Sequence, residues 1–237
     1  MDKPTLKERA RNIAHHLDPD GIKQRKLPRP IILEFTGPPD TGKTTVIDAF
    51  DTFFRRVGFL VQRPQEGAEV IRHIPRDDPK YNIATGIYQL DLILKAERDR
   101  VFDLFLFDRA LYDSFSWMQY WLQKGKLSEE EARAYQRFFT DPRWRKSIDV
   151  AYYLICDPEE AIRRNLQGVP IDEFGGTTNP ESLKLLTDIV TGSYEHWKAR
   201  EAPVTLLDTT HLSQREVASD LLEKTITLLE RRFDVTG

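Results

Sequence analysis

Residues 35–45 read FTGPPDTGKTT, and this stretch carries the strongest signal in the chain. Gly37 and Gly42 stand five positions apart and are followed at once by Lys43 and Thr44, which fits Gly-x-x-x-x-Gly-Lys-Thr in full. In that pattern the glycines let successive backbone N–H groups point at phosphate oxygens, the lysine reaches the terminal phosphates, and the hydroxyl ligates Mg²⁺. The alternative is an ordinary strand–turn–helix with a fortuitous lysine.

The flanking sequence favours phosphate binding. IILEF at 31–35 is a short apolar strand that leads into the glycines, and VIDAFDTFF at 46–54 has apolar residues at helical spacing. A helix that starts directly after the loop adds unpaired N–H groups and the positive end of its dipole. We therefore expect a nucleotide to bind the whole loop: Gly37, Pro38, Pro39, Asp40, Thr41, Gly42, Lys43, Thr44 and Thr45.

Strand-like and helix-like segments alternate along the rest of the chain. The other expected strands are 58–63, 103–108, 150–156 and 203–210, and the main expected helices are 86–101, 110–123 and 212–233. This alternation predicts an α/β fold, a three-layer sandwich with a five-stranded, mostly parallel sheet and helices on both faces.

The N-terminal segment has a different pattern. Leu6, Ala10, Ile13 and Leu17 recur at helical spacing, so we expect a short amphipathic helix there. We divide the chain into a helical extension, 1–29, and a main domain, 30–237. Whether the helix packs on that domain or on a second subunit is left open by the sequence.

Composition narrows the cellular setting. The 237 residues carry a net charge of −3, which disfavours a surface built to bind nucleic acid. Cys156 is the only cysteine, so a disulfide within the chain is excluded, and its apolar surroundings predict a buried structural thiol. No apolar run approaches the roughly 20 residues that span a bilayer. We expect a cytoplasmic protein without a membrane segment.

In this order the features resemble the P-loop kinases of small molecules, especially the thymidylate kinase and deoxynucleoside kinase group, over residues 30–232. The resemblance implies the P-loop NTPase fold, ATP and Mg²⁺ as cofactors, and a nucleoside or nucleoside monophosphate as acceptor. Long helices beside the third strand often build homodimers in these families, but the sequence leaves the oligomeric state open. Asp40 stands where many of these kinases have a third glycine, but aspartate tolerates left-handed backbone better than most residues.

Two catalytic segments follow from the resemblance. In FDR, 107–109, Asp108 would assist Mg²⁺ together with Thr44, and Arg109 would bind the acceptor or the transferring phosphoryl group. In RPQEGAEVIR, 63–72, Glu66 would accept the proton of the acceptor hydroxyl. The alternatives are a helix-capping aspartate beside a surface arginine, and a glutamate in a solvated turn.

The third segment, DPEEAIRRNLQGVPIDEFGG at 157–176, resembles the lid of these kinases. We place the lid at about 160–180, with Arg163 and Arg164 closing over the phosphates. Its glycines, Gly168, Gly175 and Gly176, would loosen the far side. An ordinary helix with two exposed arginines is the alternative.

The weakest signals concern the two bases. The resemblance implies that Tyr88 and Gln89 hold the acceptor base, that Arg98 faces the same pocket, and that Asp208 borders the adenine. A helix-face tyrosine and a surface glutamine explain the pair at 88–89 nearly as well. The leading hypothesis is an ATP-dependent kinase. The alternative is a P-loop ATPase or nucleotide-dependent switch that regulates a protein partner through the N-terminal helix.

Overall fold

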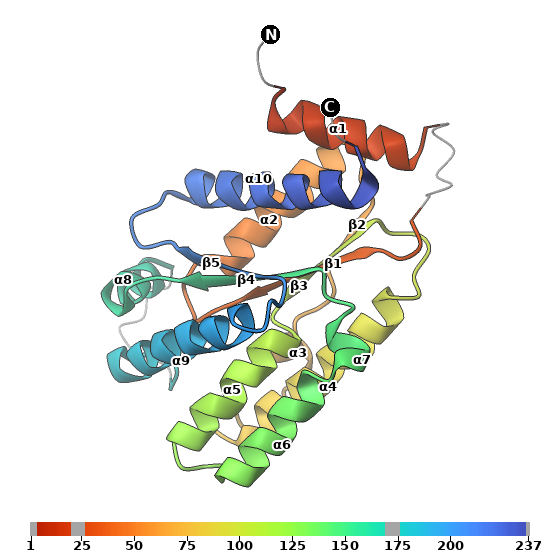
Figure 1. Cartoon of the computed structure of the whole chain (residues 1–237). Coiled ribbons are helices and arrows are strands. Elements are labelled where there is room, and N and C mark those ends of the chain that lie inside the picture. The colour runs from red at the N-terminus through yellow and green to blue at the C-terminus, as the bar shows by residue number, and fades with distance from the viewer. Residues whose placement is uncertain (1–3, 20–26, 169–175, 236–237) are drawn as a thin grey trace.

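The computed structural model describes residues 4–19, 27–168 and 176–235. Its centre is one parallel sheet of five strands in the order β2-β3-β1-β4-β5 (Figure 1). The strands are β1 (Ile31–Thr36), β2 (Val61–Gln62), β3 (Leu104–Asp108), β4 (Val150–Ile155) and β5 (Val204–Asp208). The five-stranded parallel sheet predicted from the sequence is therefore confirmed.

Helices cover both faces of the sheet, which gives three layers. Leu33 and Phe35 of β1 point into a core shared with the first group of helices, whereas Ile32 points into a core shared with the second. The first group is α1 (Leu6–Leu17), α2 (Lys43–Arg56) and α10 (Gln214–Phe233). The second is α4 (Pro79–Ala96), α5 (Leu111–Gln123), α6 (Glu129–Phe139) and α9 (Pro180–Lys198).

The N-terminal helix packs on the main domain of its own chain. The side chains of Ala10, Ile13 and Leu17 are buried in the same core as α10. Beside them, Arg9 donates hydrogen bonds to both carboxylate oxygens of Glu230 at 2.7 Å. Figure 1 shows α1 lying along α10 on the outside of that layer. The apolar face of α1 is therefore covered, and the boundary at residues 29 and 30 stays a prediction.

Several element boundaries differ from the sequence prediction, among them both ends of α4 and both ends of β2. Helix α4 begins at Pro79, seven residues earlier than expected, because the Asp78 side chain caps it by accepting a hydrogen bond from Lys80 N at 2.9 Å. Strand β2 keeps only two residues in the ladder, because Gly58 has a left-handed φ of 104° and the chain turns there. Three short helices complete the structure: α3 (Gly67–Val70), α7 (Pro142–Arg145) and α8 (Pro158–Gly168).

This topology decides where a ligand can bind. The chain leaves β1 toward one side of the sheet and β3 toward the other, and in open parallel sheets the ligand crevice lies beyond the carboxyl ends of such strands. The loop after β1 and the Asp108–Arg109 segment after β3 both lie at that edge, because β1 and β3 pair in parallel. Across the described residues, no helix is long and apolar enough to cross a membrane.

Candidate active site

The loop between β1 and α2 has the geometry that phosphate binding requires. Gly37 has φ 143°, and a Cβ atom there would lie 2.0 Å from the carbonyl oxygen of Leu154 on β4. Gly42 at the N-cap of α2 has φ 89°, and Asp40 also adopts a left-handed backbone, with φ 61°. The loop is therefore seated against β4 with α2 starting directly behind it, so that helix donors face the loop.

Lys43 is folded back over this loop. Its ammonium group donates a hydrogen bond to the carbonyl oxygen of Pro38 at 2.6 Å, and its side chain is buried. Burial, together with the nearby positive charge of Arg109, lowers the pKa of Lys43 to about 8, and the negative charge of Asp108 opposes the shift. An anion in the loop would restore the preference of this side chain for its charged form.

The two predicted metal ligands lie together. The Thr44 hydroxyl donates a hydrogen bond to Oδ2 of Asp108 at 3.0 Å. The other carboxylate oxygen of Asp108, Oδ1, is buried and has no hydrogen-bond partner among the residues described. Oxygen ligands of this kind suit Mg²⁺, which in phosphate sites takes one or two protein ligands and completes its shell with water and phosphate.

No denser metal site competes with this pair. Within residues 4–19, 27–168 and 176–235, no group of three or more His, Cys, Asp or Glu side chains could hold a metal ion. The donor set around the loop therefore fits a metal that arrives with a phosphate ligand rather than one held by the protein alone.

Arg109 and Glu66 also meet, although they come from different strands. Arg109 follows β3 with a left-handed φ of 64°. Its Nε lies 3.5 Å from Oε1 of Glu66, the N-cap residue of α3, and its Nη1 lies 2.9 Å from Oδ1 of Asp113 on α5. Burial lowers the pKa of Arg109, but the surrounding carboxylates outweigh it and raise the pKa above its ordinary value. Burial raises the pKa of Glu66, and the charge of Arg109 opposes this.

Two buried acids near Arg109, Asp113 and Glu34, were not predicted from the sequence. Asp113 is buried and accepts a second hydrogen bond, from the Thr36 hydroxyl, at 2.7 Å. Glu34 on β1 is fully buried and accepts from the backbone nitrogens of Ala110, Tyr112 and Asp113 at 2.8 to 3.1 Å. Burial raises the pKa of Glu34 to about 8, against the lowering effect of these donors. An acid inside the apolar run IILEF was the available signal for Glu34.

Arg109 and Glu66 line a hollow of about 230 Å³, which we call the α4 hollow. Its wall also includes Gln89 of α4, whose Oε1 is buried and without a hydrogen-bond partner in the described part of the chain. Trp117 of α5 closes another side, with the Arg109 guanidinium 6.0 Å from its ring centroid. Further polar residues line it: Arg76, Tyr81, Asn82, Thr85, Asp113, Ser114, Thr177 and Thr178.

Two residues predicted for the acceptor site lie elsewhere. Tyr88 does not line the α4 hollow, because its side chain leaves α4 about 100° around the axis from that of Gln89. Arg98 is exposed beyond the C-terminal end of α4. Of Tyr88, Gln89 and Arg98, which were predicted to lie near the acceptor base, only Gln89 lines the α4 hollow.

A second hollow, of about 750 Å³, lies between the loop and α8, and we call it the α8 hollow. It is lined by Lys43, Thr44 and their neighbours, by Arg163 and Arg164, and by the loop after β5. Arg163 is exposed and forms an ion pair with Glu160 at 2.6 Å. Arg164 donates a hydrogen bond to the carbonyl oxygen of Thr209 at 2.7 Å. Both predicted arginines therefore face the side of the loop on which a triphosphate tail would lie.

Helix α8 also touches the loop directly. The Asn165 amide donates a hydrogen bond to Oδ2 of Asp40 at 3.0 Å. The rest of the predicted lid, 169–175 with Gly175, lies outside the described residues, while Gly168 ends α8 and Gly176 precedes α9. Asp208 is exposed at the end of β5 and accepts from Thr210 N at 2.9 Å, and Thr209 and Thr210, not Asp208, line the α8 hollow.

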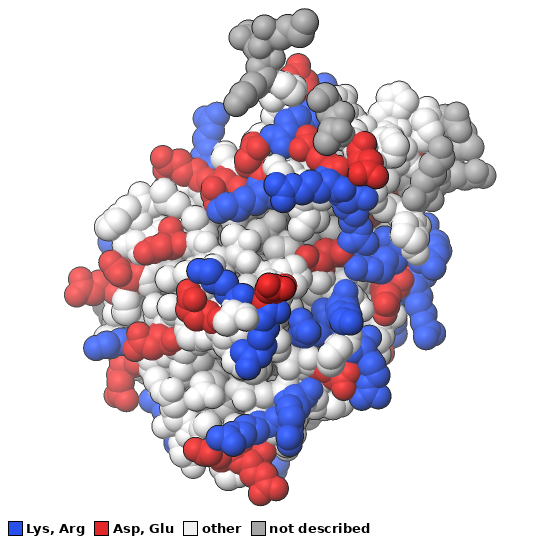
Figure 2. All heavy atoms as spheres, in the orientation of Figure 1, with Lys and Arg blue, Asp and Glu red and all other residues white. Residues whose placement is uncertain are grey.

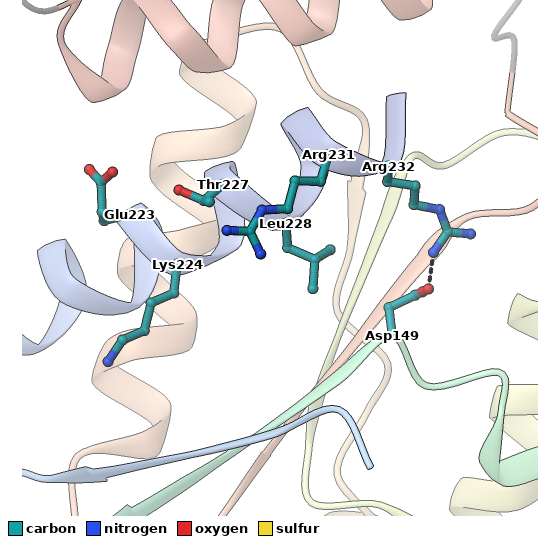
Figure 3. Close-up of a pocket in the computed structure, with 7 residues that line it drawn as sticks. All are labelled: Asp149, Glu223, Lys224, Thr227, Leu228, Arg231 and Arg232. Carbon is teal, nitrogen blue, oxygen red and sulfur yellow. Dashed lines mark hydrogen bonds and ion pairs between the residues drawn. The ribbon is translucent and has the colours of Figure 1, made fainter. Parts of the chain in front are cut away.

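A third hollow lies at the opposite end of the strands from the other two. Figure 3 shows it beside α10, where Arg232 pairs with Asp149, the Arg231 side chain lies beside the helix, and the Lys224 side chain extends away from it. Asp149 directly precedes β4, so this hollow lies at the amino ends of the strands. It contains none of the predicted site residues, and the candidate active site is therefore the pair of hollows at the carboxyl ends.

Comparison with known proteins agrees with this architecture. No protein-family model and no curated protein sequence matches the chain. Solved structures of deoxyadenosine kinase from M. mycoides do match, with the products dCMP and a flexible dCDP, with dCTP and with dATP bound. In the same order, their sequences are 15%, 16% and 16% identical to this chain, and their TM-scores are 0.60, 0.56 and 0.58. Each match covers 83% of this chain and 99% of the other. The chain therefore shares its fold with these solved structures, a parallel sheet covered by helices on both faces.

Proposed function

We propose that the protein is a kinase that transfers a phosphoryl group from ATP to a hydroxyl group of a small acceptor, a nucleoside. One observation carries the proposal. Glu66 and Arg109 meet in the α4 hollow, and Arg109 directly follows Asp108, which is hydrogen-bonded to Thr44 at the phosphate loop. A general base, an anion-binding arginine and a nucleotide loop thus adjoin one another, as phosphoryl transfer requires.

The geometry assigns a role to each group. The loop amides and Lys43 would hold the β- and γ-phosphates, with the adenine side of ATP in the α8 hollow. Bound Mg²⁺, held through Thr44 and Asp108, would neutralise charge on the phosphates. Glu66 would accept the proton of the acceptor hydroxyl, because burial moves its pKa upward, toward the range in which a carboxylate is a useful base. Arg109 would stabilise negative charge on the transferred group.

The charges in the α4 hollow favour a nucleoside over a nucleoside monophosphate. In the described part of the chain, Arg109 and Arg76 are the cationic residues that line it. Arg109 is already paired with Asp113 and lies beside Glu66. Arg76 is exposed and lies 5.9 Å from the ring centroid of Tyr81. At Arg109, a phosphate dianion would therefore meet a cation whose charge is already balanced by carboxylates, and a neutral hydroxyl fits better.

Gln89 is our candidate for recognising the acceptor base. Its buried Oε1 lacks a partner among the described residues, and its Nε2 makes only a long contact of 3.4 Å with the carbonyl oxygen of Gln65. An amide can donate and accept at once, so it can pair with an adenine or a cytosine edge. The deoxyadenosine kinase structures contain deoxyadenosine and deoxycytidine nucleotides, which supports testing both bases.

The proposal is tested by incubating the protein with radiolabelled ATP, Mg²⁺ and a panel of nucleosides and nucleoside monophosphates. We expect label on a nucleoside. Label only on a nucleoside monophosphate would favour the thymidylate kinase-like alternative, and release of phosphate alone would favour an ATPase or switch. Lys43→Met controls for contaminating kinases. Arg63→Gln is a matched surface control, because Arg63 pairs with Asp48 outside the α4 hollow.

The remaining expectations about partners belong to this proposal. A homodimer would cover Ile87 and Leu94, which are 51% and 41% exposed and lie two turns apart on α4. Sedimentation of the wild type and of Ile87→Asp tests this, and a monomeric wild type would exclude it. We propose a cytoplasmic location, because a chain with the single cysteine Cys156 forms no disulfide within itself, which suits a reducing compartment. We expect no nucleic acid as a partner, since basic and acidic side chains are interspersed over the face in Figure 2.

A further inference from the structure

We propose that Glu34 is a positioning residue that holds Arg109 at the transfer site. Glu34 lies in the middle of the sheet, level with Phe107 of β3 and Ala151 of β4, and is fully buried. It lines neither the α4 hollow nor the α8 hollow. Any effect on the reaction must therefore be transmitted through the residues that its carboxyl group contacts.

Those contacts are with the start of α5. Oε1 of Glu34 accepts from Ala110 N at 3.0 Å and Asp113 N at 2.8 Å, and Oε2 accepts from Tyr112 N at 3.1 Å. The first N–H groups of a helix have no partner within the helix and are usually satisfied by a side chain at the N-cap. Ala110 is the N-cap residue here and has no side-chain oxygen. Glu34 supplies the missing acceptors from another strand.

The start of α5 is also the support of Arg109. Arg109 has a left-handed backbone, φ 64°, which an arginine keeps only where its surroundings hold it. Its N–H donates to the carbonyl oxygen of Phe35 at 2.9 Å, and the next residue is Ala110, held by Glu34. The backbone of Arg109 is thus fixed by β1 on one side and by the Glu34-bound helix start on the other.

The same strand also fixes the side chain of Arg109. Asp113 accepts from Arg109 Nη1 at 2.9 Å, and the same oxygen accepts from the Thr36 hydroxyl at 2.7 Å. Asp113 can do this because Glu34 binds its backbone nitrogen. Glu34 and Thr36 stand two residues apart on β1 and so point to the same face, toward α5. Strand β1 therefore positions both the backbone and the guanidinium group of the arginine.

The rate test rests on the proposed kinase function. Glu34→Gln leaves one acceptor oxygen and turns an amide N–H toward a backbone donor. We expect kcat for nucleoside phosphorylation to fall about 100-fold, the order of loss that a small misplacement of a reacting group causes. The KM for ATP should change less than about twofold, because the hydrogen bonds of the Glu34 carboxyl group go to the start of α5 and not to residues 37–45. Glu34→Asp keeps two acceptor oxygens and should recover part of the lost kcat.

Asp103→Asn is the matched control. Asp103 is also fully buried beside the sheet and accepts from Leu60 N at 2.7 Å, but it precedes β3 and so lies at the opposite edge from the site. The control makes the same chemical change, acid to amide, and should leave kcat within about twofold of the wild type. A Glu34→Gln enzyme with wild-type kcat, or an equal loss in Asp103→Asn, would overturn the proposal.

Hydrogen exchange separates this inference from the proposed function. In Glu34→Gln, the amides of Ala110, Tyr112 and Asp113 should exchange faster than in the wild type, while the amides of α2 keep their rates. This readout does not require any activity. A wild-type protein that phosphorylates no acceptor defeats the kinase proposal alone. Unchanged exchange at these three amides defeats the positioning role of Glu34, whatever the protein phosphorylates.

Discussion

Replacing Gly37 by alanine should damage both the stability and the nucleotide binding of the protein. Two independent effects act at this position. The backbone φ of 143° is one that residues with a side chain rarely adopt, and the added Cβ would lie 2.0 Å from the carbonyl oxygen of Leu154. That atom belongs to the backbone of a central strand, so it cannot move aside as the end of a flexible side chain could.

The expected cost follows from these two effects. A strained backbone conformation of this kind costs about 1–3 kcal/mol. Forcing an extra carbon atom into a packed site costs about 1–3 kcal/mol more. We therefore expect Gly37→Ala to lower the free energy of unfolding by about 4 kcal/mol. In a protein of this size, each kcal/mol shifts Tm by about 2–4 °C, so Tm should fall by roughly 12 °C.

Gly125→Ala is the control for backbone strain without a clash. Gly125 has φ 67°, and a Cβ atom there would meet nothing within 4 Å. It should cost only about 1 kcal/mol, and it lies after α5, away from the loop. Urea unfolding and thermal melts followed by circular dichroism measure both variants, and ATP titration should show weakened binding for Gly37→Ala alone. Equal stability of the two variants would refute the seating of the loop against β4.

Four further predictions concern the site and its surroundings. Asp108→Asn should reduce the Mg²⁺-dependent part of ATP affinity about tenfold, measured by titration with and without the metal. Asn165→Ala should weaken ATP binding about threefold, because the Asp40 carboxylate loses its amide donor and repels the phosphates more strongly. Adding Asp40→Asn should reverse the loss of affinity. Glu66 must lose its proton to act as a base, and burial raises its pKa. As the pH decreases, kcat should therefore begin to fall at a pH above the usual pKa of a glutamate. Glu66→Gln should abolish this acidic limb of the pH–rate profile. Burial raises the pKa of Cys156 to about 11, so a thiol reagent at neutral pH should react at least about 100-fold slower with the native protein than with protein unfolded in urea.

The parts of the structure that local sequence patterns specify could be predicted. The phosphate loop is contiguous, and its shape depends on glycines and on the strand and helix that flank it. The core-facing residues of α1 follow helical periodicity, and the buried positions Ala10, Ile13 and Leu17 confirm that prediction. The capping box of α6 is local in the same way, because Ser128 and Glu131 stand three residues apart in the sequence.

The proposed acceptor side of the candidate site could be predicted only in fragments. Its side chains come from α3, α4, α5 and the ends of two strands, so their meeting depends on how the helices pack. Neighbouring residues of one helix have very different environments: Gln89 is buried in the hollow while Tyr88 is not part of it. Arg109 and Asp113 stand four residues apart, so their ion pair is local in the sequence, but nothing local connects either of them to Glu34.

The phosphate loop and the proposed acceptor side differ in how much they indicate about the second substrate. A loop that binds phosphates with backbone N–H groups does so in the same way for any triphosphate, so it carries little information about the second substrate. The net charge of the groups around Arg109 indicates more about the second substrate. If Glu66 and Asp113 were absent, Arg109 would be a free cation suited to a phosphate acceptor. With Asp113 bound at 2.9 Å and Glu66 at 3.5 Å, the pairing leaves a carboxylate facing the hollow, where it can receive a proton from a hydroxyl group. Glu66→Ala should therefore reduce phosphorylation of a nucleoside while improving the binding of its monophosphate, because it removes a negative charge that repels the phosphate. A Glu66→Ala protein that binds nucleoside and monophosphate in the same ratio as the wild type would show that this carboxylate does not select the acceptor.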